Sequence, residues 1–337
     1  MSAGALTSTT AATARVEISD DKMPDSADLR MRLAGSNTMD LLLFSLGTSE
    51  VFGINVFKVR EITRTPGVTR APNLPHAVEG VVSLRGSIIP VISLSRLISI
   101  GIAECSNQTM MVTEFSCHVQ GFLMSSVDRI VRVDWDRVRA PDPMLSAVNA
   151  YITAVTELPG GQLVSVLDVE QVLATVYGET EVPDLDPVAR ADSTIFFADD
   201  SSVARKEIVR VLEKLAVNHQ HASNGREAWE RLQSMAARAE SEGQPLSTKL
   251  QLILTDAEMP EMDGYVLTRR IKSDARFNGI PVVMHSSLSS EANRSMGKSV
   301  GVDAYVAKFE PRVLADTLRP LIGNTAASVA PLPEVTA

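Results

Sequence analysis

The sequence predicts two domains of different fold class, an all-β domain followed by an α/β domain built on a parallel sheet. The chain has 337 residues, which is more than one hydrophobic core usually supports. From Asp40 onwards, short β-like runs are broken by Gly, Asn and Pro, whereas strand-like and helix-like segments alternate after residue 193. These observations place the boundary between the domains near residues 177–193.

The first domain is predicted from its closely spaced strand signals. Seven apolar runs fit short strands, at residues 41–46, 51–54, 81–84, 88–94, 110–115, 121–127 and 163–167. Short strands with tight connections are typical of an all-β barrel or sandwich. We expect this domain to cover residues 38–176.

The second domain is predicted from a regular β/α alternation. Its strand-like runs lie at residues 195–198, 217–222, 250–255, 282–285 and 304–307. Helical segments are expected at residues 203–215 and 225–237, after Asp263, near 289–298 and near 311–321. Five β/α units of this kind predict a parallel sheet covered by helices on both faces. We expect the domain to span residues 194–322.

The remaining segments lack apolar periodicity. Residues 1–37 are rich in Ser, Thr, Ala and Asp, a composition that predicts a disordered N-terminal tail. Residues 177–193 collect Glu, Asp and Pro and are expected to form an interdomain linker. Residues 323–337 are predicted to be a C-terminal tail that is too short for a DNA-binding output domain.

The composition narrows the class of protein. With 45% hydrophobic and 22% charged residues, the chain is typical of a soluble globular protein. No apolar run approaches the roughly 20 residues of a membrane span, and the N-terminus lacks the pattern of a signal peptide, so a cytoplasmic location is expected. The net charge of -9 disfavours nucleic-acid binding. Cys105 and Cys117 are expected to be reduced and structural.

Polar residues follow the predicted strands of the second domain. Asp199 and Asp200 follow the first strand, Asp256 follows the third, and Ser286 and Lys308 follow the fourth and fifth. The carboxyl ends of parallel strands meet in one crevice, so these side chains should converge. Converging carboxylates repel one another unless a cation such as Mg²⁺ is bound, and an aspartate is an adequate nucleophile towards a phosphoryl donor. The alternative for any single acidic residue is a solvated loop charge.

The region from about residue 194 to 321 resembles the response-regulator receiver domain. The resemblance lies in Asp199-Asp200-Ser201, in the segment from Asp256 to Gly264, in the segment from Ile280 to Ser286, and in Tyr305-Val306-Ala307-Lys308. It implies a flavodoxin-like (βα)5 fold with Asp256 as the phosphoacceptor. It also implies Mg²⁺ held by Asp199, Asp200, Asp256 and the backbone carbonyl of Glu258.

The same resemblance assigns residues that respond to the phosphoryl group. Lys308 would stabilise it, and Ser286 and Tyr305 would be the switch pair that reorients when it arrives. The alternative for Tyr305 is half-buried packing on its strand. The family commonly has Pro directly after the lysine, whereas Phe309 stands there in this sequence.

The first domain carries no nucleophile and base pair, no phosphate-binding loop and no metal-ligand cluster, so it is expected to bind rather than to catalyse. Residues 38–176 resemble a CheW-like domain, through residues 41–62, through Leu84-Arg85-Gly86 with the prolines and glycines around it, and through residues 121–127 and 163–168. The resemblance implies paired SH3-like β-barrels that contact chemoreceptor tips and the histidine kinase CheA.

Four residues are candidates for that binding surface by motif position: Val59, Glu61, Gly80 and Arg85. Three of these four assignments have an alternative. Val59 could be simple core, Gly80 could exist to let two backbones approach closely, and Arg85-Gly86 could be a β-turn with a solvated arginine.

An adaptor followed by a receiver resembles the arrangement of the CheV family. This implies a non-enzymatic, cytoplasmic chemotaxis adaptor at chemoreceptor arrays, coupling receptors to CheA under the control of phosphorylation on Asp256. The alternative is a receiver that drains phosphate from CheA while the adaptor only holds it nearby.

Overall fold

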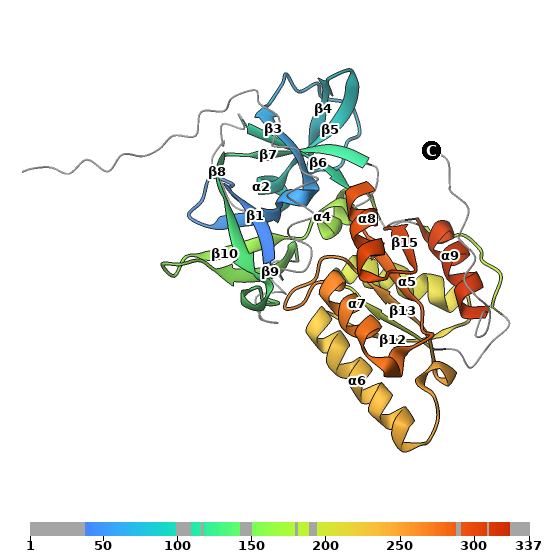
Figure 1. Ribbon diagram of the computed structural model, residues 1–337. Helices are drawn as coiled ribbons and strands as arrows, with labels where there is room; N and C mark the ends of the chain where they lie inside the picture. Colours follow the sequence, from blue (N-terminus) through green and yellow to red (C-terminus); the bar gives the residue numbers. More distant parts are fainter. Residues whose placement is uncertain are drawn as a thin grey trace, which may run out of the picture.

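The computed structural model describes residues 38–98, 109–115, 118–141, 150–178, 181–188, 194–287, 291–308 and 310–323. Figure 1 shows a β-rich N-terminal domain lying against an α/β C-terminal domain. The predicted N-terminal tail, Cys105, Cys117, Phe309 and the chain after residue 323 lie outside the described residues.

The first sheet of the N-terminal domain has the strand order β8-β1-β2-β10-β9. Its strands are β1 (Thr38–Ser45), β2 (Val51–Asn55), β8 (Ser126–Asp134), β9 (Ile152–Glu157) and β10 (Leu163–Leu167). Register shifts in the β1–β8 and β9–β10 pairs interrupt the ladders, and such shifts bend and twist a sheet. The chain returns to this sheet with β8–β10 after building the second one, so the two sheets are interwoven in sequence.

The second sheet has the order β3-β6-β7-β5-β4. It contains β3 (Val59–Arg64), β4 (Val78–Leu84), β5 (Ser87–Ser93), β6 (Thr109–Phe115) and β7 (His118–Met124). Short helical segments connect the strands: η1 (Val56–Lys58), α2 (Leu94–Leu97), η2 (Trp135–Arg137) and α4 (Val169–Tyr177). The two five-stranded sheets share a core in which Phe44 and Phe52 of the first sheet pack with Met111 and Phe122 of the second.

The strand predictions for this domain were incomplete. The run at residues 121–127 was predicted as one strand, but the structure divides it between β7 and β8 at Ser125. Strands β3 and β9 were not predicted, and only the first two residues of β8 fell within a predicted run. Most side chains of β8 are exposed or half-buried, so that strand lacks the apolar run on which the prediction relied.

The C-terminal domain has a five-stranded parallel sheet of order β12-β11-β13-β14-β15. Its strands are β11 (Thr194–Ala198), β12 (Asn218–Ala222), β13 (Leu250–Thr255), β14 (Val282–Ser286) and β15 (Ala304–Ala307). Its helices are α5 (Ser202–Lys214), α6 (Gly225–Ser241), α7 (Gly264–Ser273), α8 (Glu291–Val300) and α9 (Pro311–Gly323). Two short segments, η3 (Leu246–Thr248) and η4 (Ala275–Phe277), complete it.

Apolar side chains pack on both faces of this sheet. Residues of α6 and α7 bury Phe196 and Ile253 on one face, while residues of α5 and α9 bury Phe197 and Leu254 on the other. The alternation of Phe196 and Phe197 follows from the period of two in a β-strand. The predicted fold class, an all-β domain followed by an α/β domain with a parallel sheet, is confirmed.

Part of the predicted linker lies on the C-terminal domain. Val182, Leu185 and Val188 pack against the core formed by α5 and α9. Lys214 donates to the carbonyl of Val182 at 2.9 Å, and the amide of Val188 donates to the carbonyl of Leu215 at 2.9 Å. Among the described residues, no helix combines the length and the hydropathy required to cross a membrane.

Candidate functional site

Three aspartates converge where the sheet of the C-terminal domain reverses its strand order. Asp199 and Asp200 follow β11, Asp256 follows the neighbouring β13, and one carboxylate oxygen of each lies within 4.8 Å of the others. The carboxyl ends of adjacent parallel strands form the ligand crevice of such sheets. The structure therefore brings together the three acidic residues that the sequence singled out.

The loop after Asp256 is shaped by a cap and a close backbone approach. Asp263 accepts a hydrogen bond from the amide of Val266 at 2.7 Å and so caps α7. A Cβ atom on Gly264 would lie 1.8 Å from the carbonyl oxygen of Asp256. Only glycine allows the start of α7 to pass this close to the end of β13.

Lys308 reaches the same crevice from the end of β15. Its buried ammonium lies 2.8 Å from Oδ2 of Asp256 and 2.9 Å from Oδ2 of Asp199. The amide of Lys308 donates to the carbonyl of Ser286 at 3.0 Å, which ties β15 to the end of β14. Oδ1 of Asp256 accepts a hydrogen bond from the amide of Ala257. The carboxylate of Asp256 is thus held in place by the amide of Ala257 and by the ammonium of Lys308.

Burial disfavours the ionised form of these carboxylates. Burial raises the pKa of Asp256 to about 7, with Lys308 opposing the shift and Asp200 adding to it. Burial likewise raises the pKa of Asp199 and of Asp200, again against the influence of Lys308. A divalent cation would remove this penalty, because oxygen ligands are what Mg²⁺ prefers. The residues present therefore fit a Mg²⁺ site.

Ser286 and Tyr305 lie on the neighbouring strands β14 and β15. Ser286 is fully buried, and Tyr305 is half-buried beneath the guanidinium of Arg294, 5.7 Å from the ring centre. Burial raises the pKa of Tyr305 to about 12, while hydrogen bonding with Ser286 and Tyr265 lowers it. The two predicted switch residues are therefore in contact, and packing and hydrogen bonding both hold the tyrosine.

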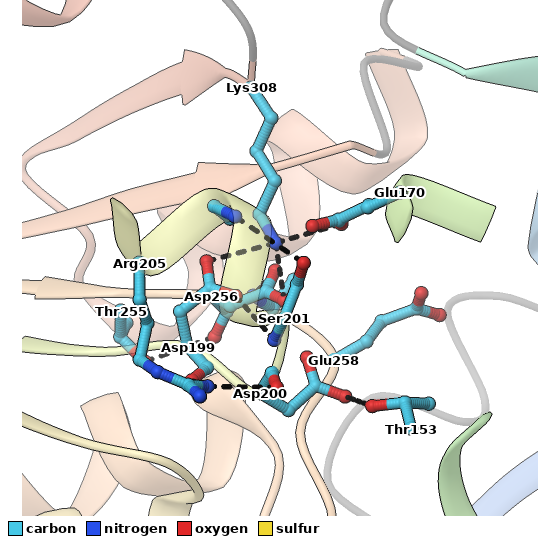
Figure 2. A network of polar contacts seen from close by, with 12 residues as sticks. Thr153, Glu170, Asp199, Asp200, Ser201, Arg205, Thr255, Asp256, Glu258 and Lys308 are labelled. Carbon is cyan, nitrogen blue, oxygen red and sulfur yellow. Dashed lines mark hydrogen bonds and ion pairs between the residues drawn. The ribbon is translucent and has the colours of Figure 1, made fainter. Parts of the chain in front are cut away.

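The N-terminal domain also contributes side chains to the site. Figure 2 shows Glu170 of α4 pointing at Lys308, and the two form an ion pair at 3.0 Å. Thr153 of β9 donates to Oδ2 of Asp200 at 2.9 Å. The crevice is therefore completed by the other domain.

Glu258 turns its side chain towards the N-terminal domain. Its carboxylate accepts a hydrogen bond from the side chain of Asn55 and forms an ion pair with Lys58 at 3.5 Å. The resemblance to receiver domains implies a metal-binding role only for the backbone carbonyl of Glu258, so these contacts of its side chain were not predicted.

Sequence reasoning missed Lys58, Thr153 and Glu170. Glu170 lies in the first turn of an amphipathic helix, where an acidic residue is expected for its effect on the helix dipole. Lys58 ends a short helical segment in which no motif stands out. Only the packing of one domain on the other distinguishes these side chains from solvated charges.

The four candidates for partner binding are not equivalent. Val59 is buried in the shared core. A Cβ on Gly80 would lie 2.3 Å from the carbonyl oxygen of Thr69, so two backbones meet there. Glu61 and Arg85 form an ion pair at 2.6 Å between β3 and the β4–β5 turn, and the arginine side chain is mostly exposed. The geometry favours the packing alternatives for Val59 and Gly80 and leaves Glu61 and Arg85 at the surface.

Two family models match the chain, the CheW-like domain over residues 40–176 and the response regulator receiver domain over residues 195–319. Chemotaxis protein CheV3 of Helicobacter pylori is 30% identical over 285 residues, covering 82% of this chain and 90% of CheV3. Chemotaxis protein CheW of Klebsiella aerogenes is 31% identical, covering 43% of this chain and 87% of CheW. Chemotaxis protein CheY1 of H. pylori is 34% identical, covering 39% of this chain and 97% of CheY1.

Proposed function

Because the chain belongs to the CheV family of chemotaxis proteins, with an adaptor domain and a receiver domain, we propose that it couples chemoreceptors to the histidine kinase CheA. Phosphorylation of Asp256 in the receiver domain changes that coupling. The protein works at the receptor arrays as a binding component.

One observation carries this proposal: the buried ammonium of Lys308 lies between Asp256 of the receiver and Glu170 of the adaptor. A phosphoryl group on Asp256 adds negative charge and oxygen acceptors directly beside this lysine. A change in the contacts of Lys308 therefore alters its ion pair with Glu170 of the adaptor domain.

The chemistry proposed for Asp256 is a single phosphoryl transfer. A carboxylate oxygen of Asp256 attacks the phosphorus of a phosphohistidine on CheA, and the new O–P bond forms as the P–N bond breaks. The nitrogen keeps the bonding electrons, and with a proton on its other ring nitrogen it leaves as neutral imidazole. Lys308 neutralises charge on the phosphoryl oxygens.

Asp199, Asp200, Asp256 and the backbone carbonyl of Glu258 would hold Mg²⁺, which supplies further positive charge for the phosphoryl oxygens when bound. In this proposal the hydroxyl of Ser286 hydrogen-bonds the phosphoryl group. Its movement would break or rearrange its contact with Tyr305, and this pair reports phosphorylation to the surface formed by α8 and β15.

The adaptor surface proposed for receptor and kinase binding is centred on the Glu61–Arg85 pair. Val59 and Gly80 support that surface from below, since both are buried.

The proposal is tested by radiolabel transfer from phosphorylated CheA in the presence of Mg²⁺, comparing the native chain with Asp256→Ala while receptor and kinase binding are followed. Labelling that the substitution abolishes, with binding retained and kinase activity altered by phosphorylation, supports a phosphorylation-controlled adaptor. Rapid labelling and loss of phosphate with no change in kinase activity would instead support a phosphate sink.

A further inference from the structure

The ammonium of Lys308 is surrounded by carboxylates in this structure, because it donates hydrogen bonds to Asp256 and Glu170 and forms an ion pair with Asp199. An ammonium group has three N–H donors. Three carboxylate oxygens lie within 3.0 Å of it, from Asp199, Asp256 and Glu170. A phosphoryl oxygen on Asp256 would therefore compete with these carboxylates for the ammonium of Lys308. Asp199 and Asp256 belong to the receiver itself, whereas Glu170 belongs to the adaptor and can leave with it.

The adaptor also places a cation near the acidic crevice. The ammonium of Lys58 lies 3.5 Å from Oε2 of Glu258. Burial alone would lower the pKa of Lys58, but Glu258, Glu170, Asp200 and Asp256 raise it well above its ordinary value. The adaptor thus supplies an anion that pairs with the receiver's Lys308 and a cation that pairs with Glu258 beside the acidic crevice.

The contacts between the domains also restrict access to Asp256. The carboxylate of Asp256 and the ammonium of Lys308 are almost completely buried. Two cavities of about 30 Å³ each remain at this boundary, one lined by Asn55, Trp135 and Glu258 and the other reaching Asp200. Such volumes hold water but no phosphohistidine side chain.

We propose that the adaptor domain covers the phosphorylation site of its own receiver, with Glu170 occupying the phosphoryl position on Lys308 and Lys58 compensating the acidic crevice. The adaptor cannot cover Asp256 while Asp256 carries a phosphoryl group. In the phosphorylated protein the adaptor is therefore separated from this site. The inference rests on Asp256 being the phosphoacceptor. It goes beyond the proposed function because it names the adaptor surface around Glu170 and Lys58 as the one that phosphorylation releases from the receiver.

The first test compares the full-length native chain with Glu170→Gln, using acetyl phosphate and Mg²⁺ so that no kinase is needed. The glutamine keeps the size of the side chain but removes the anion that competes for Lys308. Labelling of Asp256 should be faster by roughly 5- to 150-fold, the range of ordinary coupling between sites. Glu50→Gln, which removes an exposed carboxylate on the β1–β2 turn, should leave the rate unchanged.

The second test measures separation of the two domains without changing Glu170 or Lys58. The chain has two tryptophans, and Trp135 lines both interdomain cavities while its carbonyl accepts a hydrogen bond from the amide of Glu261. In a Trp229→Phe background, beryllofluoride with Mg²⁺ should increase the quenching of Trp135 by acrylamide. Adding Asp256→Ala should abolish that increase.

The two tests separate this inference from the proposed function. If beryllofluoride binds without increasing the quenching of Trp135, the proposal that the adaptor covers Asp256 is overturned, whether or not CheA activity responds to phosphorylation. Equal labelling of the native chain and Glu170→Gln also overturns it. Increased quenching, together with CheA activity that does not respond to phosphorylation, supports the cover and contradicts only the coupling function.

Discussion

Glu207 in α5 is a buried carboxyl close to the contact between the two domains. Burial raises its pKa to about 7, the neighbouring Glu170 raises it further, and Lys308 opposes the shift. Below pH 4.5 the carboxyl is neutral in both the folded and the unfolded chain. Between about pH 4.5 and 7 only the unfolded chain loses the proton, so stability falls as the pH rises, and above pH 7 the full penalty is present.

We therefore expect Glu207→Gln to stabilise the chain at pH 8 by about 1 to 3 kcal/mol and to have little effect at pH 4.5. Urea unfolding followed by helical circular dichroism at both pH values measures this. The same stabilisation at both pH values would show that ionisation of Glu207 is not the cause.

Gly264 is a second residue whose identity is dictated by its surroundings. Because an added Cβ would meet the carbonyl oxygen of Asp256, Gly264→Ala must displace backbone at the candidate site. We expect the receiver to lose about 1 to 3 kcal/mol of stability and beryllofluoride affinity to fall. Gly67→Ala serves as the control, because nothing lies within 4 Å of its added Cβ. Equal stability of the two variants would refute the steric argument.

At the scale of elements, the turn of the β4–β5 hairpin contains Arg85, which we propose for partner binding, next to Gly86. Arg85 and Gly86 have φ values of 50° and 85°, the left-handed region used by two-residue hairpin turns. Arg85→Asn should preserve the turn, since asparagine tolerates positive φ, while removing the exposed guanidinium and its pair with Glu61.

The expected result is a free energy of unfolding within about 0.5 kcal/mol of the native value, together with weaker binding to receptor or CheA in a pull-down or titration. Gly86→Ala provides the converse variant, because it strains the turn and keeps the arginine. Undiminished binding by Arg85→Asn would assign Arg85 to the turn alone.

The elements that sequence patterns predicted are those with strong apolar runs. Strand β13 was predicted at residues 250–255 and has those bounds, because every residue in it is buried. Most of strand β8 was missed because its side chains are mostly exposed and four of its nine residues are charged. The convergence of Asp199, Asp200 and Asp256 could be predicted because each directly follows a strand whose place in the sheet the fold class defines.

The adaptor's part in the site could not be predicted in this way. Glu170 and Lys308 lie in different domains, and no rule of strand order or helix periodicity relates their positions. Their contact depends on how two folded surfaces pack, which is set by many side chains at once. Glu61 and Arg85 were selected by motif position alone, and the structure adds that they pair.

At the scale of the whole molecule, the contacts between domains divide into a buried centre and an exposed rim. Arg226 of α6 pairs with Asp136 of η2 at 3.1 Å, but both side chains are largely exposed. Exposed pairs contribute little to stability, whereas removing one partner from a buried pair leaves an uncompensated charge. The covering of the site should therefore depend on Glu170 and not on Arg226.

Small-angle X-ray scattering on the full chain checks this distribution. Beryllofluoride with Mg²⁺ should increase the radius of gyration of the native chain, and Glu170→Gln should increase it without the ligand. Arg226→Gln should resemble the native chain in both conditions. An Arg226→Gln chain as extended as Glu170→Gln would place the main contact at the rim.

The segment formed by residues 181–188 sets how far the two domains can part. It lies along the receiver, with Val182 and Val188 against the core and Lys214 paired with Asp184, while the last adaptor helix ends at Tyr177. An adaptor that separates therefore remains on a short tether, at a local concentration on the order of millimolar. Re-closure after loss of phosphate is then an intramolecular event whose rate does not depend on how many copies of the protein the cell contains. In each chain, the adaptor therefore returns to its own receiver without the help of a second copy.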